Sequence, residues 1–153
     1  MKKNIVALVM LCSSVAVLGM SAPARAEMGK SSIGPAISIG GGTTVFGIDS
    51  RFGVSENLSL RPFITFPSGG TTFGTALTYD FDISRGNKVQ ITPFIGGGVE
   101  VATGGGISET QAYFTGGADF GITDSVELKA ALEVPLSSNN SSTSVTLGAG
   151  FRF

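Results

Sequence analysis

Two acidic residues separated by one position are the best candidate for chemistry in this sequence. Asp80 and Asp82 would lie on one face of a β-strand, because side chains alternate between the two faces. Such a pair can belong to a cation site or act as an acid and a base. A cation site needs more oxygen ligands than this spacing supplies. We therefore interpret the pair as part of a polar face, balanced by Arg51, Arg61 or Lys88.

The residues for nucleophilic or metal-dependent catalysis are missing. The chain has no histidine, which excludes Ser-His-Asp and Cys-His arrangements and removes the commonest metal ligand. Gly29-Lys30-Ser31 resembles the end of a P-loop, but Ala24 stands where its first glycine is required. Glycine triplets elsewhere precede no predicted helix, as dinucleotide binding would need. The sequence predicts neither enzymatic activity nor a cofactor.

The charge content excludes a second class of function. Only 14% of the residues are charged and the formal net charge is −1. A nucleic-acid-binding protein needs a basic surface to neutralise phosphates. We therefore expect no nucleic-acid partner.

The first 26 residues have the pattern of a secretory signal peptide. Lys2 and Lys3 precede a mostly apolar stretch, and small residues surround Arg25 at the predicted cleavage site after Ala26. Cleavage would remove three of the ten basic residues and the single cysteine. The predicted domain at 27–153 therefore carries a net negative charge and cannot form a disulfide.

The rest of the chain alternates between apolar and polar residues, which is the period of a β-strand. In the last segment, Val145, Leu147 and Phe151 share one face, whereas Thr146 and Arg152 share the other. Similar segments predict strands at 33–41, 44–54, 58–66, 71–83, 88–102, 110–122, 126–136 and 143–153. Pro62, Pro93 and Pro135 lie inside these segments, where we expect bulges or nearer strand ends.

The connections also alternate in character. Tight polar turns are predicted at 55–57, 84–87 and 123–125. Glycine- or serine-rich loops are predicted at 40–43, 67–70, 103–109 and 137–142. If the chain starts in the periplasm, every tight turn lies on that side, which is typical of transmembrane barrels. The fold predicted is an all-β, eight-stranded antiparallel up-and-down transmembrane β-barrel.

The polar face is expected to line the lumen of this barrel. Its small residues suit the narrow interior of eight strands, and its long charged side chains occur in both signs, so that they can pair. The predicted lumen charge network consists of Asp49, Arg51, Arg61, Asp80, Asp82, Lys88, Glu100, Asp119, Glu127, Lys129, Glu133 and Arg152. The apolar face would then contact outer-membrane lipid.

The last strand carries a resemblance to a known family. Val145 to Phe153 ends in Phe151-Arg152-Phe153 and is similar to the C-terminal signal of bacterial outer-membrane barrels. The hairpins at 51–60 and 119–128 also resemble those of the OmpA/OmpX-like superfamily. The resemblance implies that barrel-assembly machinery reads Phe151 and Phe153, and that the protein lies in the outer membrane.

Three functions follow from these expectations. The first is a structural or surface-interaction role in the envelope, without catalysis and with no external partner that the sequence identifies. The second is a narrow passive pore, although eight strands leave a lumen that side chains can fill. The third is a soluble exported barrel that binds an apolar ligand.

Overall fold

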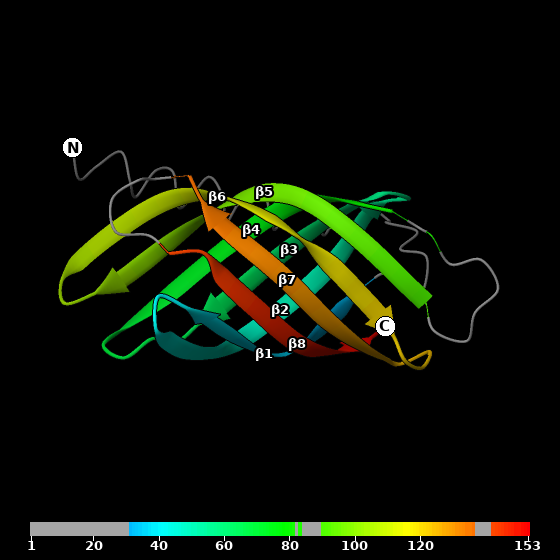
Figure 1. The fold of residues 1–153 in the computed structure, drawn as a ribbon, viewed down its shortest axis with the longest axis horizontal. Helices are drawn as coiled ribbons and strands as arrows, with labels where there is room; N and C mark the ends of the chain where they lie inside the picture. The colour runs from blue at the N-terminus through cyan, green and yellow to red at the C-terminus, as the bar shows by residue number, and fades with distance from the viewer. Residues whose placement is uncertain (1–30, 82, 84–89, 137–141) are drawn as a thin grey trace.

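The computed structural model describes residues 31–81, 83, 90–136 and 142–153, which form a closed barrel of eight antiparallel strands (Figure 1). The strands are β1 (Ser32–Gly40), β2 (Thr43–Ser55), β3 (Leu58–Thr65), β4 (Gly70–Asp80), β5 (Gln90–Gly104), β6 (Ile107–Gly121), β7 (Val126–Pro135) and β8 (Ser144–Arg152). Each strand pairs with its neighbours in chain order, and β8 pairs with β1 to close the ring. The predicted fold class is confirmed.

No helix in the described ranges has the length and apolar character needed to cross a membrane.

The alternation of the sequence becomes an apolar outside and a polar inside. In β7, Leu128 and Leu132 are 45% and 46% exposed, whereas Glu127 and Ala131 are both 4% exposed. Phe151 of β8 is 59% exposed. In β7 and β8 the large apolar side chains therefore cover the outer surface, and the charged side chains are enclosed.

The two ends of the barrel differ in their connections (Figure 1). The terminal end carries Ser31 and Phe153, whose backbones share a hydrogen bond of 3.0 Å, together with the turns after β2 and β6. The hairpin end carries the turns after β1, β3 and β5. The predicted loop at 137–142 lies outside the described residues except for Ser142, and the predicted turn at 84–87 lies entirely outside them.

The predicted loop at 103–109 is wrong, because β5 and β6 continue until only Gly105 and Gly106 separate them. These glycines have φ values of 56° and 80°, and Gly41 and Gly42 between β1 and β2 have 57° and 77°. Positive φ at both central residues gives a two-residue hairpin turn whose twist matches that of the strands. A glycine-rich sequence thus formed tight turns here rather than open loops.

The expected bulges do not occur at the prolines. β3 pairs continuously with β4 through Pro62, whereas the pairing of β2 with β3 stops at Ser50 and Arg51 and resumes in the same register. The Ser50 hydroxyl donates to the Pro62 carbonyl at 2.8 Å. The register shift between β2 and β3 lies elsewhere, at Gly53 and Ser55.

The other two prolines lie where a missing N–H disrupts little. Pro93 is one residue beyond the end of the β4–β5 pairing, and its carbonyl accepts a hydrogen bond of 2.7 Å from the Phe81 N–H. Pro135 is the last residue of β7. Sheets tolerate proline at such positions because no interior ladder bond is lost.

Candidate functional site

The lumen is crossed by salt bridges that converge on Asp119 of β6. Its Oδ2 lies 2.9 Å from Nη1 of Arg51 in β2 and 2.7 Å from Nη2 of Arg61 in β3. All three side chains are at least nine-tenths buried. Because neither β2 nor β3 is a neighbour of β6 in the ring, these contacts span the interior.

A second set of contacts extends the network towards the terminal end. Nη2 of Arg51 lies 2.8 Å from Oε2 of Glu127, and Nε of Arg152 lies 3.7 Å from the same oxygen. The Ser32 hydroxyl donates to the other Glu127 oxygen. Arg152 also donates from Nη2 to the side-chain oxygen of Gln90 at 2.8 Å.

On the wall formed by β3 and β4, the carboxylate of Asp80 accepts hydrogen bonds from several donors. Nη2 of Arg61 lies 3.2 Å from Oδ1 of Asp80, and the Ser59 hydroxyl donates to Oδ2 at 2.5 Å. The Thr78 hydroxyl donates to Oδ1 at 2.9 Å and accepts from Nε of Arg61 at 2.9 Å. Asp80 is therefore a structural partner of Arg61, whereas Asp82, the other member of the predicted pair, lies outside the described residues.

One further ion pair completes the network, between Nζ of Lys129 and Oδ2 of Asp49 at 2.5 Å. We call the whole set the ion-paired layer. It consists of Arg51, Arg61, Lys129, Arg152, Asp49, Asp80, Asp119 and Glu127. Its four cations balance its four carboxylates. Paired and hydrogen-bonded charges are the form in which a narrow interior accepts ionised groups.

Aromatic side chains also enter the lumen. Cζ of Arg61 lies 3.7 Å from the ring centroid of Phe94, which is 3% exposed. The rings of Phe63 and Tyr113 meet edge to face, with centroids 6.1 Å apart. We call Phe63 and Tyr113 the aromatic pair.

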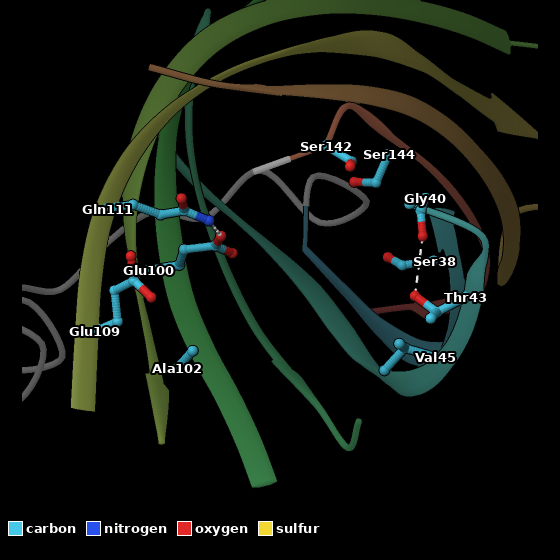
Figure 2. Close-up of a pocket in the computed structure, with 11 residues that line it drawn as sticks. Ser38, Gly40, Thr43, Val45, Glu100, Ala102, Glu109, Gln111, Ser142 and Ser144 are labelled. Carbon is cyan, nitrogen blue, oxygen red and sulfur yellow. Dashed lines mark hydrogen bonds between the residues drawn. The ribbon is translucent and has the colours of Figure 1, made fainter. Parts of the chain in front are cut away.

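The hairpin end of the lumen opens into a cavity of about 510 Å³, which we call the vestibule (Figure 2). Its lining mixes polar and small apolar residues and consists of Ser38, Gly40, Gly41, Thr43, Val45, Glu100, Ala102, Glu109, Gln111, Ser142 and Ser144. Figure 2 shows Glu100 and Gln111 on one wall, facing Ser38 and Thr43 on the other. Gln111 donates to Glu100, so this carboxylate is held by an amide rather than by a cation.

The structure separates the twelve predicted network residues into three groups. Eight form the ion-paired layer. Glu100 lines the vestibule, and Glu133 accepts a hydrogen bond of 3.2 Å from the Ser144 hydroxyl. Asp82 and Lys88 lie outside the described residues. The predicted assembly signal, Phe151 and Phe153, is 59% and 55% exposed on the outer surface.

Phe63 and Phe94 were not predicted to face the lumen. Phe63 alternates in phase with Arg61 and Thr65, and Phe94 alternates in phase with the polar Thr92. Their position on the polar face was therefore a usable signal. Ser59 and Thr78 were missed as hydrogen-bond donors to Asp80, because the sequence does not show which inward hydroxyl groups meet a carboxylate. Thr78 is two residues away on β4, and Ser59 lies on the neighbouring strand β3.

No three His, Cys, Asp or Glu side chains of the described ranges are arranged to hold a metal ion.

The closed ring, its apolar outside and its ion-paired inside define the fold of the small eight-stranded outer-membrane barrels. Among solved structures, the N-terminal β-barrel domain of Pseudomonas aeruginosa OprF is similar, with 16% identity and a TM-score of 0.64. The match covers 82% of this chain and 98% of that domain. The fold expected from the resemblance to the OmpA/OmpX-like superfamily is confirmed.

Two designed proteins have the same architecture. A structure from the de novo design of transmembrane β-barrels is 16% identical, with a TM-score of 0.66, and the match covers 82% of this chain and 97% of that one. The designed barrel TMB2.3 is 13% identical, with a TM-score of 0.60 and coverages of 82% and 95%. Neither a protein-family model nor a curated protein matches the sequence.

Proposed function

We propose that this chain is a small integral β-barrel of the outer membrane, with a structural or surface-interaction role in the cell envelope, a closed lumen and no catalysis. The observation that carries the proposal is the direction of the side chains. Leu132, Leu147 and Phe151 are exposed, whereas the side chains of Lys129 and Arg152 are 9% and 12% exposed. This arrangement stabilises a barrel in lipid, because closure pairs the backbone and lipid covers the apolar face.

The height of the apolar surface supports a membrane location. Exposed apolar residues extend from Val126 to Leu136 in and just after β7, and from Val145 to Phe153 in and just after β8. A tilted strand needs about 9–11 residues to cross the hydrocarbon core. These runs therefore match the length that a bilayer requires.

The filled lumen supports a structural role over a pore. The ion-paired layer joins β2 and β3 to β6 and β7 across the centre. Its member Asp119 is 2% exposed, and Thr78 beside the layer is 1% exposed. The soluble alternative, with an apolar ligand in the barrel, fits poorly because the vestibule lining includes Glu100, Glu109 and Gln111.

Fractionation of the cell envelope tests the location directly. We expect the native protein in the outer-membrane fraction, resistant to extraction by salt. Recovery of the folded barrel in the soluble periplasmic fraction would overturn the proposal. Purified protein in planar bilayers should give no discrete openings, and reproducible openings would favour the passive pore.

Leu132→Arg separates a membrane barrel from a soluble one. An arginine that faces lipid near the bilayer midplane lowers the free energy of unfolding by about 2–4 kcal/mol. The same change on a water-facing surface stays within about 0.5 kcal/mol. Denaturant unfolding in lipid vesicles measures the difference. Ile107→Arg is the matched control, because Ile107 is 74% exposed and is the first residue of β6, beside the β5–β6 turn at the end of the barrel.

A further inference from the structure

On each of its two strands, the aromatic pair lies on the hairpin-end side of the ion-paired layer. Along β6, the inward positions run from Asp119 through Tyr113 to Gln111, which lines the vestibule. Along β3, Phe63 follows Arg61 in the direction of the hairpin end. The aromatic pair and the ion-paired layer therefore occupy successive levels of the lumen.

The two rings of the aromatic pair are enough to span the lumen, without a third side chain between them. β3 and β6 are separated by β4 and β5 in the ring, yet the rings of Phe63 and Tyr113 are in edge-to-face contact. Tyr113 is only 4% exposed. The wall is shaped to receive Phe63, because a Cβ on Gly74 of β4 would lie 2.8 Å from two atoms of its ring.

A dry zone separates the two levels. Ala76 lies on β4 between Thr78, which binds Arg61, and Gly74, which contacts Phe63. Its exposure is 2%, although its side chain faces the lumen. Little solvent therefore reaches this position from either end of the barrel.

We infer that the lumen is closed by two barriers in series, the ion-paired layer and the aromatic pair, and that ions cross only when both are breached. This inference rests on the proposed membrane barrel with a closed lumen. It also assigns a selectivity to the opened state. The vestibule carries Glu100 and Glu109, and no cation of the described ranges forms a salt bridge with either. A path that ends in this vestibule favours cations over anions.

Conductance of three variants in planar bilayers tests the series arrangement. Arg61→Ala with Asp80→Ala removes one cation and one carboxylate, so the remaining layer stays balanced. Phe63→Ala with Tyr113→Ala removes the aromatic pair. We expect both double variants to give no openings, like the unaltered protein. The quadruple variant should give discrete openings. In a salt gradient, its reversal potential should be shifted towards the equilibrium potential of the cation.

The outcomes separate this inference from the proposed function. Openings in the unaltered protein would contradict both. Openings in one double variant would show a single barrier and overturn only the inference. A folded quadruple variant that gives no openings, or that selects anions, would also overturn it.

Thiol labelling gives a second readout that does not need the quadruple variant to fold. Ala76→Cys places a thiol between the two levels, in a chain whose single natural cysteine is Cys12 within the predicted signal peptide. A small charged thiol reagent should leave this cysteine unmodified in the otherwise unaltered barrel in detergent micelles. It should modify the cysteine in either double variant, because each exposes the dry zone to one end. Modification in the unaltered barrel, or protection in either double variant, would contradict the inference.

Discussion

The two halves of the lumen are built on the same alternation and have opposite properties. In the half near the terminal end, four cations and four carboxylates pair across the ring and fill the space. In the half near the hairpin end, Glu100 and Glu109 border an open cavity together with small hydroxyl residues. The comparison shows that alternation determines which residues face inward, whereas their size and charge determine whether the interior closes.

The difference also separates structural charges from solvated ones. A carboxylate that is buried between two guanidinium groups contributes to stability only while its partners remain. A carboxylate beside an open cavity keeps its water, so its removal changes little. Substitutions in the two halves should therefore differ by several kcal/mol.

The largest effect is expected for Asp119→Leu. This change leaves Arg51 without one of its two carboxylate partners and Arg61 with Asp80 alone. Breaking a buried pair from one side costs about 3–5 kcal/mol, because an uncompensated charge stays in the interior. Urea unfolding of the refolded barrel in vesicles measures the loss. Asp124→Leu, in the exposed turn after β6, is the control.

A loss below about 1 kcal/mol for Asp119→Leu would mean that the ion-paired layer is solvated like a surface salt bridge. The contrast between the two halves of the lumen would then disappear.

Gly74→Ala should have an intermediate effect at the boundary between the halves. The added methyl group would meet the ring of Phe63 and the Cβ of Glu100, both at 2.8 Å. Overpacking of this kind costs about 1–3 kcal/mol in a well-packed interior. The same unfolding assay measures it. Combination with Phe63→Leu should recover part of the loss, and an unchanged deficit would show that Phe63 is not the obstructed group.

The smallest effect is expected for Glu100→Gln and Glu109→Gln in the vestibule. Each should change the free energy of unfolding by less than about 0.5 kcal/mol. Any change should shrink further at about 1 M salt, where screening acts over roughly 3 Å. Unfolding at low and high salt checks both points. A loss as large as that of Asp119→Leu would place these carboxylates in a buried network.

Much of the fold was predictable because one face of every strand is apolar. In β7 and β8 the alternation is unbroken, and the predicted strands at 126–136 and 143–153 agree with the structure to within one residue. The hairpin at 103–109 was predicted less well. Glycine at 104–106 indicates conformational freedom, and only the register of β5 against β6 shows that this freedom produces a two-residue turn.

The members of the charged interior were predictable, but their partners were not. Arg51 and Asp119 both fall on the polar phase of their strands, yet they are 68 positions apart in sequence and meet only because the ring brings β2 opposite β6. The contact within the aromatic pair was not predicted for a different reason. Phe63 falls on the polar phase of its strand, but only the structure shows that Gly74 opposite it provides the space for its ring.

The seam between β1 and β8 determines how such a molecule can enter a bilayer. It joins Ser32 to Arg152, near the two extremes of the described chain, and its pairing is missing at Gly34 and Pro35. Until this seam forms, two strand edges carry unpaired amides that hydrocarbon cannot solvate. A contact between such distant residues forms slowly. Insertion and closure of the barrel must therefore proceed together. The last pairing to form is then also the one that satisfies the remaining backbone groups and stabilises the barrel in lipid.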